Sequence, residues 1–380
     1  MPEPAGRAAA ANCEVEPIAD RGRFDACAAE WEALRRAVGA ADPFASHSWV
    51  SIFWKHFGPE GRTAVLLLRA AGEPALGLPL VVPPGAARLA RARLWRSLTN
   101  HHSYRFTPLV DPKRAGEAGE ALFRWLRHRG DAAVLELVPG DARSLRPWLE
   151  GWQAAGGRFR LWKAVPSPYV RIEGDWEAYE AGLRTKFRAN LRRRRRNLEK
   201  REGEVAVETV TGGERLAGAL GDALEIEAAG WKGRRGSAIR CRPELASFYA
   251  EWCARAAELG WLRLSFLTAG GRRIAFNLNL EVEGREYCLK IGYAPEMARY
   301  SPGQLLWQEL LRDAFRRGLS EFDFLGDVTP AKQEWRPALR DVYWVYLYLP
   351  TAAGRLHEAV KFGAVPRLKR WTARWRSRAT

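Results

Sequence analysis

The stretch WLRLSFLTAGGRRIAFNLNLEVEGREYCLKIGY (Trp261–Tyr293) holds three apolar runs separated by two turns that contain glycine, Ala269–Gly271 and Glu283–Gly284. Short apolar runs separated by such turns are typical of antiparallel strands joined by hairpins. The next stretch, RYSPGQLLWQELLRDAFRRGLSEFDFLGD (Arg299–Asp327), predicts a helix over Pro302–Arg317 and then a strand at EFDFLGD. The predicted order is therefore hairpin, strand, loop, helix and strand.

The segments around this stretch predict further helices and strands. A long helix is expected over Trp176–Arg201, because its apolar residues form one stripe. The short strand VAVETV follows, and then two more helices, over Leu216–Ala229 and Pro243–Leu259. Downstream, the alternating run VYWVYLYL (Val342–Leu349) predicts a final strand.

The N-terminal half repeats the same order of elements. Two predicted helices, near Phe24–Val38 and Ser48–Phe57, precede a hairpin formed by TAVLLLRA and ALGLPLVV. An extended stretch around Leu94–Val110, a helix over Glu117–Arg129 and the buried strand AAVLELV come next. The repetition favours an α+β fold made of two related units, each a mixed, mostly antiparallel sheet flanked by helices.

The length of the chain, 380 residues, also suits two domains, and 47% of its residues are hydrophobic. We expect a disordered lead over residues 1–14, an N-terminal unit over 15–165, a C-terminal unit over 166–350 and a basic helix or tail over 351–380.

Basic residues give the chain a formal net charge of +17. They are concentrated in KFRANLRRRRRNLEKRE (Lys186–Glu202), with nine basic and two acidic residues, and in the tail from Lys361 to Arg378. Such clusters attract polyanions, for example nucleic acid, anionic lipid, nucleotide sugars or the phosphates of acyl-coenzyme A. The alternative is an arginine-rich surface that is simply solvated.

The cysteines indicate the compartment. The five are odd in number and widely spaced, with no CxxC pair, which favours reduced thiols in the cytoplasm and argues against a zinc site. No apolar run approaches the ~18–20 residues that span a bilayer, and the N-terminal segment lacks the pattern of a signal peptide. We therefore expect a cytoplasmic protein without metal, whose basic tail favours peripheral contact with the anionic inner face of the membrane.

Several motifs occur in an order that resembles the CelD-like acetyltransferases of the GNAT superfamily. They are GWKGRRGSAI (Gly230–Ile239), GGRRIAFNLNL, YCLKIGYAPE, RYSPGQLLWQELLRDAFRRGLSEFDFLGD and KQEW. The resemblance covers residues 180–340 and extends to the Fem-type aminoacyltransferases, which also contain two GNAT-like units. It implies an acyltransferase whose N-terminal unit is a degenerate copy that shapes the acceptor groove.

The start of the predicted helix at Pro302 suits the pyrophosphate of acyl-coenzyme A, the donor that the resemblance implies, with acetyl as the first choice of acyl group. Proline fits the first helical turn, Ser301 can cap it, and Gly303 leaves backbone N–H groups open at the positive helix end. We expect the donor to contact Arg299, Ser301, Pro302, Gly303 and Gln304. The usual GNAT pattern has glycines at the third and fifth positions after Gln or Arg, so this chain departs from it.

Three residues are candidates for catalysis. Lys290 is a cation inside an apolar strand, so it faces a cleft or pairs with a carboxylate. Tyr293, at the end of that strand, can protonate the departing thiolate, as a tyrosine does in many GNAT enzymes. Asp327, at the end of the next strand, can accept the amine proton. Simple packing of the tyrosine and a turn or cap role of the aspartate are the alternatives.

Further residues of the motifs are expected on the acceptor side: Glu227, Trp231, Lys232, Asp323, Lys332 and Trp335. Glu227 and Trp231 share a helix face at i and i+4. Asp323 lies among apolar neighbours and is alternatively a buried partner of Lys290 or of an arginine.

The reaction implied by these residues and by the resemblance is attack of an amine on a thioester. The expected acceptor is an amino sugar or a precursor of an envelope or secreted polysaccharide. A Fem-type transferase that takes its acyl group from aminoacyl-tRNA is a second hypothesis, favoured by the arginine run. A third is a non-catalytic protein that its basic segments hold on nucleic acid or on an anionic membrane.

Overall fold

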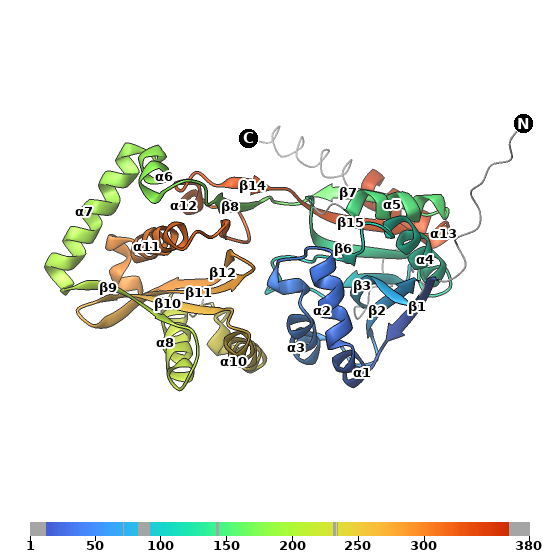
Figure 1. The fold of residues 1–380 in the computed structure, drawn as a ribbon, viewed down its shortest axis with the longest axis horizontal. Coiled ribbons are helices and arrows are strands. Elements are labelled where there is room, and N and C mark those ends of the chain that lie inside the picture. Colours follow the sequence, from blue (N-terminus) through green and yellow to red (C-terminus); the bar gives the residue numbers. More distant parts are fainter. Residues whose placement is uncertain are drawn as a thin grey trace, which may run out of the picture. The chain divides into compact units, whose positions relative to one another are not determined.

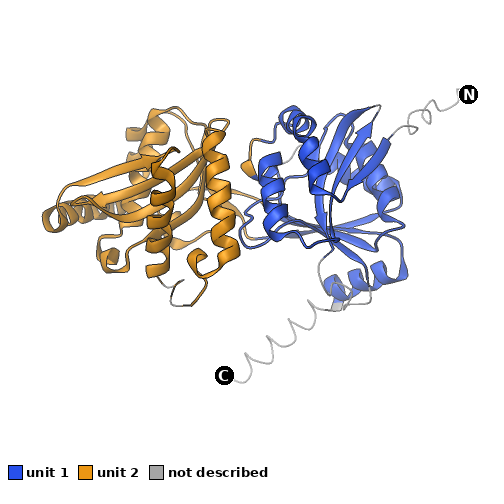
Figure 2. Cartoon of the chain, turned by 90° about the horizontal axis from the view of Figure 1, so that it is seen from below, with its two compact units in different colours: residues 1–40, 44–164, 342–380 blue, residues 41–43, 165–341 orange. Residues whose placement is uncertain are grey.

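The computed structural model describes residues 13–70, 72–82, 92–141, 144–230, 233 and 235–364. The elements of this chain, labelled in Figure 1, form two compact units. Unit 1 contains the described residues of 1–40, 44–164 and 342–380, and unit 2 contains residues 41–43 and 165–341 (Figure 2). Each unit is built on its own sheet, and the chain leaves the first unit and later returns to it.

The sheet of unit 1 is mostly antiparallel. Its order is β1-β2-β3-β4-β6-β15-β7, with β5 paired to β3, and β4 runs parallel to β6. The strands are β1 (Cys13–Ile18), β2 (Thr63–Ala70), β3 (Glu73–Val81), β4 (Leu94–Ser97), β5 (Leu109–Val110), β6 (Ala132–Pro139), β7 (Arg158–Lys163) and β15 (Val342–Tyr348).

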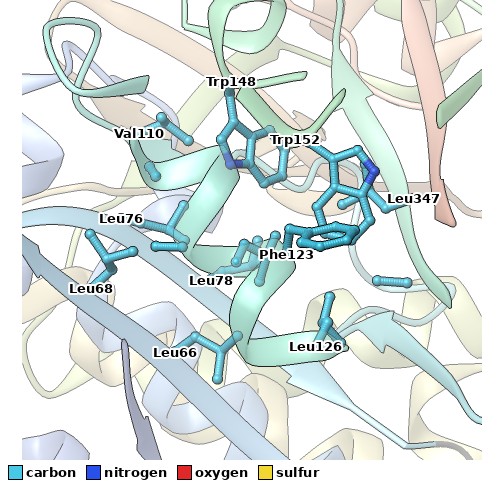
Figure 3. Packing of buried hydrophobic residues seen from close by; sticks show 14 of the residues in the cluster. Leu66, Leu68, Leu76, Leu78, Val110, Phe123, Leu126, Trp148, Trp152 and Leu347 are labelled. Carbon is cyan, nitrogen blue, oxygen red and sulfur yellow. The ribbon is translucent and has the colours of Figure 1, made fainter. Parts of the chain in front are cut away.

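α4 (Ala115–Leu126) and α5 (Leu145–Ala154) pack on this sheet around a core of leucines and large aromatic residues, which Figure 3 shows. The other helices before and after them are α1 (Arg21–Ala26), α2 (Ala28–Ala37), α3 (His47–Phe57) and α13 (Ala352–Glu358), with the short η1 (Pro43–Ala45) and η5 (Ala359–Ala364). α4 and α5 cross at glycines: a Cβ on Gly151 would lie 2.0 Å from the carbonyl oxygen of Gly116. The first turn of α4 is therefore covered by α5.

The sheet of unit 2 has the order β14-β8-β13-β12-β11-β10-β9. β12 and β13 are parallel, and the other neighbours are antiparallel. The strands are β8 (Ser167–Arg171), β9 (Val205–Val210), β10 (Leu262–Ala269), β11 (Arg272–Val282), β12 (Arg285–Tyr293), β13 (Glu321–Asp323) and β14 (Ala338–Arg340).

The helices of unit 2 follow the predicted order with one difference. They are α6 (Trp176–Gly182), α7 (Thr185–Glu202), α8 (Arg215–Ala229), α10 (Pro243–Glu258), α11 (Pro302–Arg316) and α12 (Pro330–Gln333), with η3 (Ile239–Cys241) and η4 (Pro295–Tyr300). The single helix predicted over Trp176–Arg201 is broken, because Leu183 is buried with an extended backbone between α6 and α7. No helix of the described chain combines the length and the apolar composition that a membrane span requires.

The strand VYWVYLYL belongs to the sheet of unit 1, not to that of unit 2. β15 lies between β6 and β7 and pairs antiparallel with both. The second unit therefore ends at Asp341, before the predicted limit at residue 350. At the other end, β1 begins at Cys13, inside the expected lead. Residues 1–12 and the basic tail from 365 lie outside the described residues.

Both units share one order of elements. Unit 1 has β2, β3, β4, α4 and β6, and unit 2 has β10, β11, β12, α11 and β13. In each case a hairpin leads to a third strand and a helix, and the next strand runs parallel to the third. The prediction of an α+β fold with two related mixed sheets flanked by helices is confirmed.

Candidate functional site

β12 and β13 part soon after they pair. Their parallel register covers three residues of each strand, and it ends where Tyr287 lies opposite Asp323. β12 continues to Tyr293, and no other strand of the described chain pairs with its outer edge beyond that point. The register with β11 slips here as well, because Leu289 is an extra residue opposite the step from Leu278 to Asn279. Such a bulge bends a strand and ends its pairing.

The bulge also decides which side chains of β12 reach α11. Before it, Cys288 contacts Asn277 on the α11 side of the sheet. After it the alternation is shifted by one residue, so Tyr293 lies beside Gly303, where a Cβ would be 4.0 Å from the tyrosine ring. Lys290 lies on the opposite face, with its Nζ 5.6 Å from the ring centroid of Tyr249 in α10. The structure therefore places Lys290 away from the start of α11.

α11 begins after a left-handed residue, Ser301, whose φ is 49°. Its hydroxyl makes no capping hydrogen bond, so the side-chain cap predicted from the sequence is wrong. Instead its carbonyl oxygen accepts from the N–H groups of Gln304 (2.9 Å) and Leu305 (3.2 Å). The N–H of Gly303 has no acceptor in the described part of the chain. A free N–H at the positive end of a long helix suits an anionic ligand.

A pocket of about 1130 Å³ joins this helix start to the open edge of β12. β12 contributes Ile291, Gly292 and Tyr293 to its wall, and Ser301, Gly303, Gln304 and Trp307 come from the start of α11. The other lining residues are Arg184, Lys186, Phe187, Asn190, Arg194, Ile226, Glu227, Gly230, Asn277, Pro295, Ala298, Thr329, Ala331 and Glu334. All of them belong to unit 2.

Glu227 is a buried carboxylate in this wall. It lies in the last turn of α8 with 5% of its surface exposed, and its Oε2 accepts from the N–H of Ile239 at 2.9 Å. Trp231 and Lys232, which the sequence placed beside it, lie outside the described residues. Among the described residues predicted on the acceptor side, Glu227 is the one that lines the pocket.

Gln304 and Trp335 brace the wall that follows β13. The indole Nε1 of the fully buried Trp335 donates to Oε1 of Gln304 at 2.7 Å, and Nε2 of Gln304 donates to the carbonyl oxygen of Ala331 at 3.0 Å. Trp335 also packs edge-on against Phe187, with the ring centroids 5.0 Å apart. The structure therefore gives Trp335 a structural role in place of the predicted substrate contact.

Asp327 and Lys332 lie in the turn after β13. Nζ of Lys332 donates to the carbonyl oxygens of Leu325 (2.6 Å) and Asp327 (2.9 Å), and burial lowers the pKa of this ammonium group. Lys332 thus fixes the turn, and neither residue is among those that line the pocket. The carboxylate of Asp327 is on an exposed residue.

Asp323 is completely buried and serves the fold. It accepts from Nη1 of Arg340 at 2.8 Å and from the N–H of Leu325 at 2.8 Å. Nη2 of the same arginine donates to Glu321 at 2.7 Å. Asp323 is therefore the buried partner of an arginine, one of the alternatives drawn from the sequence. Its carboxylate is used within the fold, which corrects the predicted contact with substrate.

Arg299 and Pro302, two of the residues predicted to contact the donor, do not line the pocket. Arg299 is exposed, lies 3.4 Å from Glu202 and stacks on the ring of Tyr300, so its side chain is outside the pocket wall. Pro302 is buried at the first turn of α11 and fixes its backbone. Ser301, Gly303 and Gln304 line the pocket.

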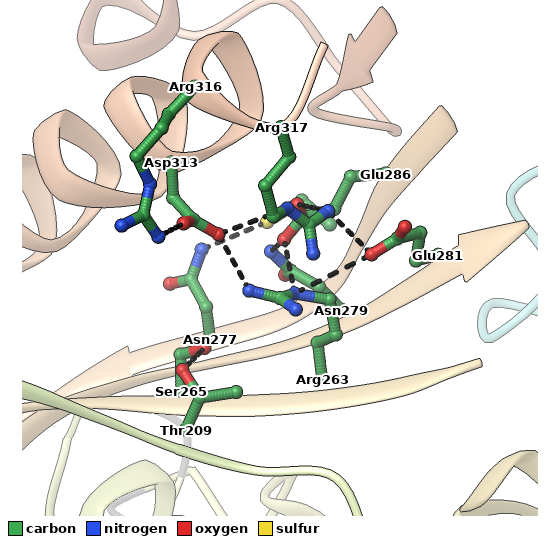
Figure 4. Close-up of polar contacts among 11 residues, drawn as sticks. Thr209, Arg263, Ser265, Asn277, Asn279, Glu281, Glu286, Asp313, Arg316 and Arg317 are labelled. Carbon is green, nitrogen blue, oxygen red and sulfur yellow. Dashed lines mark hydrogen bonds and ion pairs between the residues drawn. The ribbon is translucent and has the colours of Figure 1, made fainter. Parts of the chain in front are cut away.

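A polar network holds the C-terminal end of α11 on the sheet (Figure 4). Asn279 donates to Glu286 at 2.7 Å, and Arg263 donates to Asp313 of α11 at 2.8 Å. Arg317, just after α11, lies 3.2 Å from Asp313. Burial raises the pKa of the Glu286 carboxyl. The network therefore anchors the helix whose other end opens into the pocket.

Individual residues of α7 in the pocket wall were not predicted from the sequence. Arg184 precedes the helix, and Lys186, Asn190 and Arg194 follow at helical spacing. Their spacing was the signal that could have identified them together, because positions 186, 190 and 194 are i, i+4 and i+8 on one helix face.

A family model of known proteins matches part of unit 2. Residues 185–333 match the family model described as acetyltransferase (GNAT) domain, and the matched segment includes α7, α8, β12 and α11. A search for similar sequences among curated proteins finds no significant match. The match supports an acyltransferase.

Solved structures with the same fold span nearly the whole chain. FemX is 13% identical, with a TM-score of 0.57 over 87% of this chain and 96% of its own. The C-terminal domain of a protein described as a lysylphosphatidylglycerol synthetase, from Agrobacterium fabrum, is 12% identical, with a TM-score of 0.53 over 89% and 94%. L-PGS from Bacillus licheniformis is 13% identical, with a TM-score of 0.51 over 88% and 93%. At these identities the likeness concerns the fold alone.

Proposed function

We propose that unit 2 transfers an acyl group, acetyl first of all, from coenzyme A to an amine. One arrangement carries the proposal: a single pocket joins the free N–H of Gly303, the open edge of β12 and the buried carboxylate of Glu227. The GNAT match over the same residues supports it. The start of α11 suits the pyrophosphate of the donor, and the apolar edge at Ile291 suits its uncharged arm.

The transfer needs two proton movements. The amine nitrogen attacks the thioester carbonyl carbon, the C–S bond breaks and an amide forms, so the amine loses one proton and the thiolate gains one. We propose that the carboxylate of Glu227 accepts the proton of the amine and that the hydroxyl of Tyr293 donates a proton to the thiolate. Both side chains line the pocket. N–H groups of the open β12 edge would stabilise the developing oxyanion.

The assignment of the base changes the expectation drawn from the sequence. Asp327 was the first candidate there, but its exposed carboxylate belongs to a turn outside the pocket wall. Glu227 reaches the pocket from α8, and Gly303 reaches it from α11. An acceptor amine bound near α8 would thus lie opposite the donor.

The acceptor that we propose is an amino sugar or a precursor of an envelope polysaccharide. This choice rests on the resemblance of the motifs to the CelD-like enzymes. A pocket of about 1130 Å³ leaves room for a sugar beside the reactive end of the donor.

A second candidate is a transferase that uses aminoacyl-tRNA, as the Fem-type resemblance implies. One observation favours it: Arg184, Lys186 and Arg194 line the pocket, and clustered cations bind the phosphates of nucleic acid. The two donors differ in size and in salt dependence, so they can be separated by experiment.

Release of free coenzyme A thiol from acetyl-coenzyme A, measured with a panel of amino sugars, tests the proposed function. We expect release that depends on the amine and the appearance of an N-acetyl product. Transfer from charged tRNA without thiol release would support the second candidate instead. Binding of RNA or anionic vesicles with no transfer from either donor would favour the non-catalytic hypothesis.

Replacing Gly303 with valine is expected to weaken acetyl-coenzyme A binding by about tenfold or more. The branched side chain would crowd the free N–H at the start of α11, which costs about one charge-assisted hydrogen bond. A Cβ here meets the Tyr293 ring only at 4.0 Å, so the fold should tolerate the change. Isothermal titration measures the affinity, with Gly303→Ala as the smaller matched change. An unchanged Kd in the valine variant would remove the helix start from the donor site.

A further inference from the structure

The cations of α7 that face the pocket point to a second phosphate site on the donor, and this inference rests on the proposed function. We infer that Lys186 and Arg194 bind the ribose 3′-phosphate of coenzyme A, separately from the pyrophosphate at the start of α11. The chemical feature that they would recognise is a phosphate monoester on the adenosine end of the donor.

The geometry of α7 creates a stripe of donors along the pocket. Lys186, Asn190 and Arg194 are spaced by four residues and all three line the pocket. At 1.5 Å per residue, the stripe from 186 to 194 is roughly 12 Å long. The long side chains of Lys186 and Arg194 can therefore approach one phosphate group from either side, above Asn190.

The cations of α7 differ in whether they form ion pairs within the protein. Away from the pocket wall, Arg195 pairs with Glu199 at 3.0 Å and with Glu309 of α11, so it holds the two helices together. In the wall, Lys186 and Arg194 have no ion-pair partner among the residues that the structure describes. Structural pairing thus accounts for Arg195 and leaves these two cations for a ligand.

The charge of the pocket wall also favours an anion. Its acidic members are Glu227 and Glu334, and Glu334 lies 3.7 Å from Arg184. Glu227 comes from α8 and is the proposed base. The wall at α7 therefore keeps the charge of Lys186 and Arg194 uncompensated, next to the positive end of α11.

α7 lies on the donor side of the pocket. Phe187, in its first turn, packs edge-on against Trp335, and the indole of Trp335 donates to Gln304 in the first turn of α11 at 2.7 Å. Phe187 and Leu191 of α7 belong to the same core cluster as Met297 of η4, the turn that leads into α11. The cations are thus fixed beside the proposed pyrophosphate site.

Two donors that differ in one group test the inference. Acetyl-dephospho-coenzyme A lacks only the ribose 3′-phosphate, so titration of both esters into the full-length protein isolates that contact. We expect the wild-type protein to bind acetyl-coenzyme A about tenfold or more tightly than the dephospho ester, the ratio expected for one lost charge-assisted contact. In Arg194→Ala and Lys186→Ala this preference should fall to about threefold or less, with the affinity for the dephospho ester unchanged.

Arg196→Ala is the matched control, since Arg196 is an exposed arginine of α7 that does not line the pocket. It should keep the wild-type preference. Equal affinities of the wild-type protein for both esters would overturn the inference while leaving the proposed function intact, and so would an equal loss for both esters in Arg194→Ala. A preference kept in Arg194→Ala, with RNA binding lost, would assign the stripe to RNA and also overturn it. If neither ester binds the wild-type protein, the proposed function itself fails.

Discussion

Replacing Glu227 with glutamine is expected to lower kcat for amine acylation by about 10²–10⁴-fold, the range for loss of a general base. Glu227 is the buried carboxylate of the pocket, and its Oε2 accepts from the N–H of Ile239. Glutamine keeps an oxygen for that hydrogen bond but cannot take the proton of the amine. The fold and the Kd for acetyl-coenzyme A should therefore stay close to those of the wild-type protein.

Steady-state kinetics of the thiol release, together with titration of the donor, separate these effects. Glu225→Gln is the matched control, because Glu225 lies on the same helix with its carboxylate exposed and paired with Arg240 at 3.0 Å. It should leave kcat within about twofold. Asp327→Asn decides between the two carboxylates: loss of turnover in this variant, with turnover retained in Glu227→Gln, would return the role of the base to Asp327.

Replacing Arg340 with methionine is expected to destabilise unit 2 by about 3–5 kcal/mol, because it leaves buried carboxylates without their cation. Arg340 is 8% exposed and donates to Asp323, which is completely buried, and to Glu321. These contacts join β14 to β13, the strand that leads into the turn after the sheet.

Urea denaturation followed by circular dichroism measures this effect as a transition of unit 2 at lower urea. Arg240→Met removes an exposed ion pair of the same unit and should change the free energy of unfolding by less than about 1 kcal/mol. If Arg340→Met destabilises no more than Arg240→Met, the buried pair does not hold β13 and β14 together.

Local signals explain how much of the fold was predicted. The glycine turns of the Trp261–Tyr293 stretch fix its hairpins, and Pro302 marks the start of α11, so this order was read from neighbouring residues alone. The run at Val342–Leu349 was recognised as a strand but assigned to the wrong sheet. Alternation predicts that a strand has a buried face, whereas its partners are chosen by contacts distant in the sequence.

The candidate site was predicted less completely, for physical reasons. Ser301, Gly303 and Gln304, which line the pocket, could be selected from the sequence because a helix start is a local feature. The side of the sheet on which Lys290 lies could not be predicted, because the bulge at Leu289 reverses the faces of β12 beyond it and no residue pattern indicates a bulge. The arginine run indicated a polyanion. Which of its arginines serves the fold could not be predicted, because Arg195 pairs with Glu309, more than a hundred residues away.

Hydrogen exchange with and without acetyl-coenzyme A tests most directly whether the pocket of unit 2 is the donor site. The first turn of α11 opens into that pocket, whereas the first turn of α4, its counterpart in unit 1, is covered by α5. Protection is therefore predicted in residues 288–304 and at the start of α7, with little change in residues 109–126. Protection confined to unit 1, or no protection at millimolar acetyl-coenzyme A, would contradict the account.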